Sequence, residues 1–351
     1  MIKTEYYKDL TKMNTFGMQV KARCFMEYDS VADLVDIEFE ELARPVLHIG
    51  GGSNLLFTDD FKGTVLHSKI NFIEMLDECP DGPEVLVSVG AGVIFDDFCD
   101  WAAKEGLWGV ENLSYIPGEV GASAVQNIGA YGVEVKDVIR KVYCYDTVDE
   151  EFVNFDVEDC EYGYRDSVFK DPEIKGRYVV THVVFALSRT PQPKLEYGNL
   201  KGALDCHPER SEGSLTPMQI RKAIIRIRKE KLPETSVTGS AGSFFKNPVI
   251  SAEHFARIEA AAKAESGPDY KVPHYDLPDG TVKVPAAWMI EQCGWKGKRS
   301  GGAAVWEKQP LVIVNYTGEA YPEEIVGLEK RIVASVKTKF DVELHPEVEH
   351  I

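Results

Sequence analysis

The chain has 351 residues, of which 44% are hydrophobic and 10% aromatic, a composition typical of a folded protein with two or three domains. Lys and Arg number 39 and Asp and Glu number 57, which gives a formal net charge of −18 at pH 7. Non-specific nucleic-acid binding depends on clustered cations, so this acidic balance argues against a nucleic-acid partner.

The sequence also argues against membrane insertion, secretion and a common metal site. No stretch approaches the ~18 apolar residues that a spanning helix needs, and the charged N-terminal residues lack the apolar core of a signal peptide. The seven cysteines are scattered and never spaced as C-x-x-C, which favours reduced thiols and argues against a zinc site. We therefore expect a cytoplasmic protein that holds no metal.

The first half of the chain is rich in strand patterns. Val-rich, Tyr-rich and alternating runs predict strands at 44–50, 63–68, 84–90, 141–147 and 177–189. Apolar residues at helical spacing predict a helix over 94–106, which Gly106 can end. Residues 112–135 are glycine-rich and carry few periodic signals, so we expect a long loop there.

Helical patterns dominate the second half. Residues 190–214 indicate a linker or an excursion loop. Thr216 and Pro217 then open a helix with a capping box that Gln219 completes. Further patterns predict helices at 251–265 and 321–340 and a strand at 311–316.

Two glycine-rich segments are candidates for ligand binding. The first, Gly50-Gly51-Gly52-Ser53-Asn54, directly follows a strand, and its backbone amides can approach an anion such as a diphosphate. A tight turn without a ligand explains it equally well. The second, residues 115–132, has a density of small residues that favours backbone packed flat against a planar or phosphate-bearing ligand. The Gly90-Ala91-Gly92 step is better explained as a strand-to-helix turn than as a dinucleotide fingerprint.

Cationic side chains add a third signal. Arg165 stands among aromatics in YGYRDS, where it can clamp a carboxylate or form a structural pair with Asp166. Arg228 belongs to a basic stretch that ends at Lys231, for which a solvated helix face is the default interpretation. The segment GSFFKNP (242–248) does not carry the pattern of a hydrolase triad.

Taken in order, these segments resemble the UDP-N-acetylenolpyruvoylglucosamine reductases, flavoenzymes of bacterial peptidoglycan synthesis. The similarity covers nearly the whole chain through NTFG (14–17), GGGSN, YIPG through Gly132, YGYRDSVFK, KLP (231–233), GSFFKNP, AAWMIEQCGWKG (286–297) and the tail HPEVEHI. VQNIGAYG and Tyr197 resemble the subtype whose extra loop presents a tyrosine over the substrate.

The resemblance implies an α+β fold. An FAD-binding region of the vanillyl-alcohol-oxidase (PCMH) type would occupy residues 1–200, as two subdomains divided near residue 68. A linker or inserted loop (201–216) and an α+β substrate-binding domain (217–351) would follow, with the C-terminal tail returning to the active site. The residues that match the family's FAD-binding segments are Gly50, Gly51, Gly52, Ser53, Asn54, Ile116, Pro117, Gly118, Gly121, Ala122, Ser123, Asn127, Gly129 and Ala130.

The resemblance also implies the reaction and its catalytic residues. The substrates would be NADPH and UDP-N-acetylglucosamine enolpyruvate, and the product UDP-N-acetylmuramate. Arg165 would be the cation that meets the charge building on the substrate carboxylate, Glu347 a protonated donor that stabilises the enol, and Ser243 the acid that protonates the carbanionic carbon. The residues that match the substrate-binding positions are Tyr197, Arg228, Lys231, Asn247 and Gln292.

Two positions in the tail depart from the family pattern. His345 stands where an acidic residue is expected before the proline, and Glu349 stands where an arginine is expected after PEV. Two other functions stay open: a flavin-dependent oxidase of an alcohol or lactone with the same fold, and a non-catalytic nucleotide-sugar binder. The sequence makes no prediction about protein partners.

Overall fold

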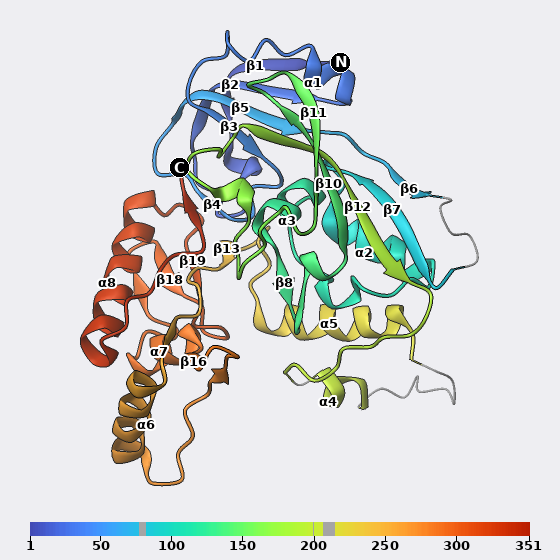
Figure 1. The fold of residues 1–351 in the computed structure, drawn as a ribbon. Coiled ribbons are helices and arrows are strands. Elements are labelled where there is room, and N and C mark those ends of the chain that lie inside the picture. The colour runs from blue at the N-terminus through green and yellow to red at the C-terminus, as the bar shows by residue number, and fades with distance from the viewer. Residues whose placement is uncertain (77–81, 199, 206–214) are drawn as a thin grey trace. The chain divides into compact units, whose positions relative to one another are not determined.

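The computed structural model describes residues 1–76, 82–198, 200–205 and 215–351, and the chain forms two compact units (Figure 1). Unit 1 comprises Met1–Leu10, Val20–Gly52 and Asp60–Glu230. Unit 2 comprises Thr11–Gln19, Ser53–Asp59 and Lys231–Ile351. Within the described ranges, none of the helices combines the length and the apolar character needed to cross a bilayer.

The first sheet of unit 1 is four-stranded, with the order β1 (Lys3–Asp9), β2 (Lys21–Tyr28), β5 (Phe61–Ser68) and β3 (Val46–Ile49) (Figure 1). β5 runs parallel to both β2 and β3, and six of its eight residues are buried. Burial on both faces favours consecutive apolar residues such as Val65 and Leu66, which explains why β5 was predictable, whereas β3 is only partly buried and was predictable from its Val, Leu and Ile residues. β1 is polar and almost wholly exposed, so it lacks the alternation that would reveal it in the sequence.

The second sheet of unit 1 is five-stranded and antiparallel, with the order β11 (Glu151–Asp156), β10 (Ile139–Asp146), β12 (Tyr178–Ser188), β7 (Glu84–Gly90) and β6 (Ile73–Leu76). Its side chains share one hydrophobic core with α2 (Phe95–Lys104) and α3 (Val120–Gln126). Gly106 adopts a φ of +73° just after α2, as expected for a residue that ends a helix.

The prediction of a long loop at 112–135 was wrong in part. This stretch contains α3, the 3₁₀ helix η2 (Glu111–Leu113) and the short strands β8 (Gly129–Ala130) and β9 (Val133–Glu134). α3 packs against β12 and β7 with Val120, Gly121, Ser123 and Ala124 buried. Its sequence, VGASAVQ, shows no amphipathic period. The small residues of α3 let it pack closely against the sheet, so the helix does not need one broad apolar face that a sequence pattern would reveal.

The helix α5 (Pro217–Lys231) starts where the capping box predicted, and Thr216 and Gln219 exchange hydrogen bonds of 2.9 and 3.3 Å. Ile220, Ala223 and Ile224 pack with Trp108 and Leu200, so α5 as far as Glu230 belongs to the core of unit 1. The predicted linker contains α4 (Leu200–Asp205), and its residues 206–214 lie outside the described part of the chain. The functional domain boundaries at 200 and 217 stay a prediction.

Unit 2 is α+β, as expected for the C-terminal part. Its main sheet has the order β13 (Gly239–Ser243), β19 (Val312–Asn315), β18 (Ala303–Val305) and β17 (Arg299–Ser300), and α8 (Pro322–Phe340) packs on β18 and β19. A smaller sheet joins β14 (Val249–Ser251), β16 (Thr281–Lys283) and β15 (Tyr275–Asp276), with α6 (Ala252–Ser266) beside it. The C-terminal strand β20 (Glu349–His350) pairs in parallel with β4 (Leu55–Leu56).

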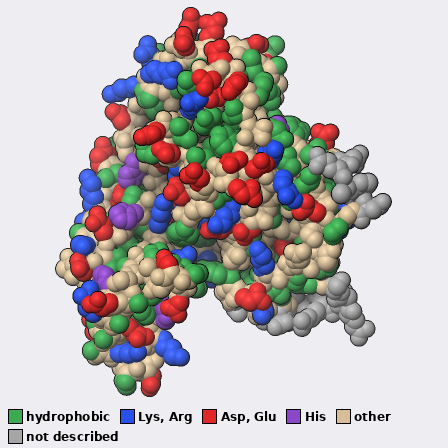
Figure 2. Space-filling view, in the orientation of Figure 1, with side chains coloured by type: hydrophobic (Ala, Val, Ile, Leu, Met, Phe, Trp, Pro, Cys, Tyr) green, Lys and Arg blue, Asp and Glu red, His purple; other side chains and the backbone are tan. Residues whose placement is uncertain are grey.

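Charged side chains do not segregate by sign on the face shown in Figure 2, where acidic and basic groups alternate over short distances. Such a mixed surface does not provide the continuous cationic path that a nucleic-acid backbone requires.

Candidate active site

The site residues predicted from the sequence fall in both units. Unit 1 holds Arg165, Tyr197, Arg228 and the FAD-binding candidates as far as Gly52 and from Ile116 to Ala130. Unit 2 holds Ser53, Asn54, Lys231, Ser243, Asn247, Gln292 and Glu347.

The two glycine-rich segments of unit 1 meet face to face. Gly50, Gly51 and Gly52 follow directly after β3. A Cβ at Gly51 would lie 3.3 Å from the Cα of Gly118, and one at Gly50 would lie 3.1 Å from the Cβ of Ala122. Gly52 has a φ of +61°, which glycine adopts without strain. Only residues without a side chain allow this approach, so the turn presents bare backbone beside α3.

This bare backbone fits the diphosphate of FAD, because amides without side chains in front of them can reach phosphate oxygens. Pro117 is exposed, and Gly50, Gly118 and Ala122 are half-buried, which leaves this strip accessible. Ser123, which was also predicted to bind FAD, uses its hydroxyl within the protein. Its hydroxyl is buried and donates to the carbonyl of Val120 at 2.7 Å, so Ser123 contributes to the helix through its side chain.

Arg165 is held by the main chain of the second glycine-rich segment. Its Nη2 donates to the carbonyl of Gly129 at 2.6 Å, and its Nη1 to the carbonyl of Asn127 at 3.3 Å. Asn127 ends α3 in the left-handed region, and its Nδ2 donates to the carbonyl of Gly163 at 2.7 Å. A Cβ at Gly129 would lie 2.9 Å from both Arg165 Nη1 and the main-chain oxygen of Val133, so glycine allows the guanidinium to approach this strand. The YGYRDS segment is thereby fixed against Asn127 and Gly129.

Backbone strain gathers around this guanidinium. In the described part of the chain eight non-glycine residues have positive φ, and four of them are Tyr115 (+62°), Asn127 (+43°), Tyr131 (+48°) and Arg165 (+56°). A residue with a Cβ pays about 1–2 kcal/mol in this region. Strain of this kind persists where surrounding contacts impose it, and it clusters at binding and catalytic sites.

Arg228 is a half-buried cation with no acidic partner among the described residues. Its Nε donates to the carbonyl of Tyr115 at 3.1 Å, and no described carboxylate lies within 4.0 Å of its guanidinium. Burial lowers the pKa of Arg228, and the positive charge of Arg165 lowers it further. Burial raises the pKa of Tyr131, and Arg228 opposes that shift. Two cations that influence each other in this way favour an anionic ligand.

Tyr197 stands beside this cluster with 44% of its surface exposed. Its ring meets the ring of Tyr131 edge to face at 6.4 Å between centroids. A Cβ at Gly132 would lie 3.4 Å from the Cβ of Tyr197. The side chain of Asn112 joins the two segments, since its Nδ2 donates to the carbonyls of Tyr131 and Lys194 at 2.9 and 2.8 Å.

In unit 2, the structure brings together the chain segments that carry Ser243 and Glu347. Ser243 is exposed at the end of β13, after a β-bulge and the positive φ of Gly242. The N–H of Glu347 donates to the carbonyl of Phe244 at 2.8 Å, and the N–H of Lys246 donates to the carbonyl of His345 at 2.9 Å. The tail therefore runs alongside residues 244–246.

Asn54 fixes the other side of the tail. Its Nδ2 donates to the carbonyl of Glu347 at 3.1 Å, and its own carbonyl accepts from the N–H of Glu349 at 2.9 Å. Further along, His350 Nε2 lies 3.2 Å from Glu329 Oε2 on α8. The two positions that depart from the family pattern, His345 and Glu349, thus take part in holding the tail through their main chains.

The remaining predicted substrate residues have structural contacts. Asn247 Oδ1 accepts from the N–H of Ala286 at 2.9 Å, which places Asn247 at the start of α7 (Ala286–Gln292). Gln292 is the last residue of α7 and lies about 9 Å from Ala286 along the helix axis. Lys231 is exposed, and its carbonyl accepts from Trp306 Nε1 at 3.0 Å. Their roles toward a substrate stay predictions.

Three groups near the unit 1 site were missed from the sequence. Tyr115 and Tyr131 contact or face Arg228, and the carboxyl of Glu119 lies beside Gly50. Arg221 on α5 bonds Asp96 and Asp100 and anchors the helix that carries Arg228. The only signal in the sequence was the spacing of Arg221 and Arg228, seven residues apart and therefore on one side of α5.

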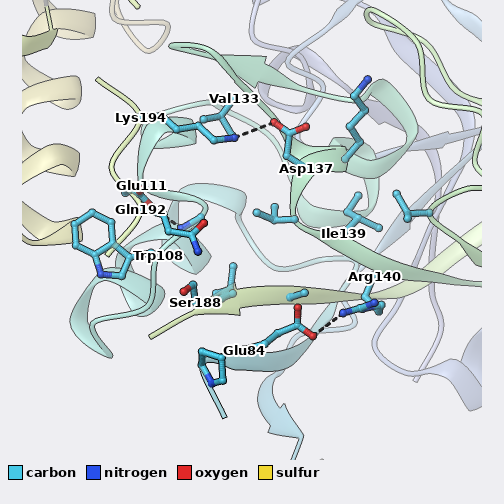
Figure 3. A pocket seen from close by; sticks show the side chains of 17 residues that line it. Glu84, Trp108, Glu111, Val133, Asp137, Ile139, Arg140, Ser188, Gln192 and Lys194 are labelled. Carbon is cyan, nitrogen blue, oxygen red and sulfur yellow. Dashed lines mark hydrogen bonds and ion pairs between the residues drawn. The ribbon is translucent and has the colours of Figure 1, made fainter. Parts of the chain in front are cut away.

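A separate cavity of about 510 Å³ in unit 1 contains none of the predicted site residues (Figure 3). Two ion pairs line it, Lys194 with Asp137 at 3.5 Å and Arg140 with Glu84 at 2.5 Å. Burial raises the pKa of Glu111 in its wall. Because its charges are already paired or balanced, this cavity does not call for a particular ligand.

Comparison with known proteins places the chain in a family. Residues 233–351 match the model for the UDP-N-acetylenolpyruvoylglucosamine reductase C-terminal domain, and residues 23–155 match an FAD binding domain. A UDP-N-acetylenolpyruvoylglucosamine reductase of Bacteroides fragilis is 48% identical over 97% of this chain and 98% of its own length. The chain belongs to the UDP-N-acetylenolpyruvoylglucosamine reductase family.

Other members of the reductase family agree with this assignment. The Porphyromonas gingivalis protein of the same name is 44% identical over 97% of each chain. The crystal structure of the Thermus caldophilus reductase, at 23% identity, covers 100% of this chain and 98% of its own with a TM-score of 0.65, which shows a shared fold. The expected fold class, an FAD-binding region followed by an α+β reductase domain, is confirmed.

Proposed function

We propose that this protein reduces UDP-N-acetylglucosamine enolpyruvate to UDP-N-acetylmuramate with electrons from NADPH, using bound FAD. The reductase relatives, which match almost the whole chain at 44–48% identity, support the activity. The observation in the structure that supports it best is the pair Arg165 and Arg228, two neighbouring cations of which the second is half-buried and has no carboxylate partner among the described residues. Both substrates are anions, so such a pair suits them.

The glycine segments would hold FAD through main-chain groups. Gly50 to Gly52, Ile116 to Gly118 and Gly121 to Ser123 would bind the diphosphate, Ser53 and Asn54 would extend this turn, and Asn127 to Ala130 would face the ring system. When bound, FAD supplies the hydride chemistry that no side chain can supply. The protein's task is then to orient the substrate and to stabilise charge.

Arg165 would stabilise the charge that develops on the substrate. Hydride addition to the methylene carbon of the enolpyruvyl group leaves negative charge on the adjacent carbon and on a carboxylate that is already anionic. A guanidinium fixed in advance meets this charge without reorganisation. The hydrogen bonds from Arg165 to the carbonyls of Asn127 and Gly129 provide that fixation.

Ser243 and Glu347 would manage the protons. Ser243 would give its hydroxyl proton to the carbanionic carbon, and Glu347, in its protonated form, would donate to the enol oxygen. The main-chain bond between Glu347 and Phe244, the neighbour of Ser243, would keep the two groups in a fixed relation. Arg228, Tyr197, Lys231, Asn247 and Gln292 would bind the diphosphate and the sugars of the substrate.

The reaction uses NADPH and a UDP-sugar, so we place the protein in the cytoplasm as part of cell-wall precursor synthesis. Purified protein should be yellow and should release FAD on acid denaturation. NADPH oxidation should require the enolpyruvyl substrate and follow ping-pong kinetics. Colourless protein that does not take up FAD would refute the proposal, and fast NADPH oxidation with oxygen alone would favour an alcohol or lactone oxidase.

A further inference from the structure

A buried histidine in unit 1 lies between two carboxylates beside the glycine turn. His67 Nδ1 is 3.0 Å from Glu27 Oε1, and His67 Nε2 is 2.9 Å from Glu119 Oε1. The side chains of His67 and Glu119 are 3% and 9% exposed. We call Glu27, His67 and Glu119 the carboxylate–imidazole triad. None of the three belongs to the residues that the proposed reaction uses.

The sheet itself aligns the triad. His67 is on β5, directly opposite Glu27 of the parallel strand β2 and opposite Ile49 of β3 on its other side. Laterally paired residues of a sheet point to the same face, so Glu27 and His67 share a face with the last residue before the Gly50 turn. Glu119 reaches this row from the residue just before α3.

The second oxygen of Glu119 points at the glycine turn. A Cβ at Gly50 would lie 3.3 Å from Glu119 Oε2, so this oxygen borders the bare backbone described above. Among the described residues, Oε2 receives no hydrogen bond, although the side chain is about nine-tenths buried. This oxygen is not enclosed by the protein, so a ligand bound along the Gly50 turn can reach it and donate a hydrogen bond to it.

The imidazole ring holds both carboxylates in place. Its two nitrogens each face a carboxylate oxygen, at 3.0 Å on the Glu27 side and 2.9 Å on the Glu119 side. Lys69 lies 3.9 Å from Glu27 and brings a positive charge to the same row. The side chain of Glu119 is thereby fixed at its Oε1, which leaves Oε2 directed at the turn.

We propose that Glu119 is a cofactor-binding residue that accepts a hydrogen bond from a sugar hydroxyl of FAD, and that His67 is the positioning residue that orients it. This inference rests on the proposed binding of FAD at the Gly50 turn. A hydroxyl is the matching donor, because diphosphate oxygens carry no proton at neutral pH, whereas the ribityl chain and the adenosine ribose both donate hydroxyl hydrogens.

The test measures the FAD dissociation constant from flavin fluorescence as FAD is added to the apoprotein. Glu119→Ala should weaken FAD binding about tenfold to a hundredfold, as expected for a lost hydrogen bond to a charged acceptor. Glu119→Gln retains an oxygen acceptor and should stay within about threefold of the wild type. Glu84→Ala, which removes a half-exposed carboxylate in the same unit, serves as the control and should leave binding unchanged.

A double-mutant cycle tests the role of His67. His67→Phe keeps the ring volume but removes both nitrogens, so it should weaken FAD binding in the wild-type background and add nothing in the Glu119→Ala background. Independent, additive effects would show that His67 acts only on the fold. If His67→Phe does not fold, as judged by thermal unfolding, the Ala and Gln variants of Glu119 still decide the assignment of Glu119.

Two fragments identify the hydroxyl. FMN carries the ribityl chain without the ribose, and ADP carries the ribose without the ribityl chain. Glu119→Ala should weaken one of the two and leave the other unchanged. Equal FAD affinity of wild type and Glu119→Ala, or unchanged FMN and ADP affinities beside weakened FAD, would overturn the assignment. A wild-type protein that does not bind FAD would instead refute the proposed function on which it rests.

Discussion

The main-chain N–H of Glu347 donates to the carbonyl of Phe244 over 2.8 Å, so the last residues of the chain are tied to the residue that follows Ser243. A segment near the C-terminus thereby becomes a neighbour of one that lies about a hundred positions earlier. Ser243 is exposed while Phe244 and Phe245 are buried, so the aromatic pair anchors the turn and leaves the hydroxyl accessible.

Replacement of Ser243 by alanine separates proton transfer from the rest of the reaction. Ser243→Ala should fold, bind FAD and accept electrons from NADPH as the wild type does. Its turnover should fall by about 10²–10⁴-fold, the usual contribution of a positioned acid. Stopped-flow absorbance of the bound flavin together with product assays measures both steps. Ser236→Ala, a change at an exposed serine of the same unit, is the control, and near wild-type turnover of Ser243→Ala would make Ser243 a packing residue of its turn.

Arg165 should not tolerate replacement by lysine. The guanidinium donates to two carbonyls at once, which a single ammonium cannot imitate in geometry. Arg165→Lys should retain FAD but should lower the rate at which the enolpyruvyl substrate reoxidises the reduced enzyme by at least about 10²-fold. Arg140→Lys, at an exposed ion pair with Glu84, provides the matched control. A rate within threefold of the wild type would exclude a role for the fork of Arg165.

Replacement by methionine should affect stability at one arginine of α5 and substrate binding at another. Arg221 pairs with Asp96 and Asp100, and its side chain is 8% exposed. Because Arg221→Met leaves two partly buried acids without a partner, it should lower the free energy of unfolding by about 2–3 kcal/mol. Arg228 has no acidic partner in the ranges that the structure describes, so Arg228→Met should keep the unfolding free energy within about 1 kcal/mol while it weakens substrate binding.

Thermal and urea unfolding measure the stability of the two variants. The Michaelis constant for the enolpyruvyl substrate measures the effect on substrate binding. Loss of stability in Arg228→Met as large as that in Arg221→Met would mean that Arg228 holds the fold and not a ligand.

Gly327 in the interior of α8 offers a stabilising change away from the site. A Cβ at this position meets no atom within 4 Å, and the residue has ordinary helical geometry. Gly327→Ala should raise the free energy of unfolding by about 0.5–1 kcal/mol, because alanine loses less backbone entropy on folding. Gly301→Ala should do the reverse, since its φ is +61° and a Cβ would collide with Glu324 at 2.0 Å. Urea denaturation measures the free energy of unfolding of both variants and of the wild type. We expect the enzymatic activity of both variants to be unchanged.

The amino-acid sequence by itself determined the kinds of local structure and the chemistry of the ligand. The apolar runs of β3, β5 and β12, the capping box of Thr216 and Gln219 and the glycines at 50–52 all act over a few residues, so their effect can be read locally. The ordered motifs, from GGGSN to the tail, indicated the reductase family. By contrast α3 was missed, because small residues pack closely without leaving a periodic pattern.

Only the tertiary structure decided which charges have partners. Arg221 and Arg228 look alike in the sequence, yet one finds two carboxylates from α2 and the other finds carbonyl and hydroxyl groups. His67 and Glu119 are 52 residues apart and become hydrogen-bonded because β5 and the start of α3 pack together. The positive φ of Arg165 likewise depends on contacts with Asn127 and Gly129. Hydrogen bonds and ion pairs form only between groups within about 3–4 Å of each other, so they depend on distances in space that sequence order does not contain.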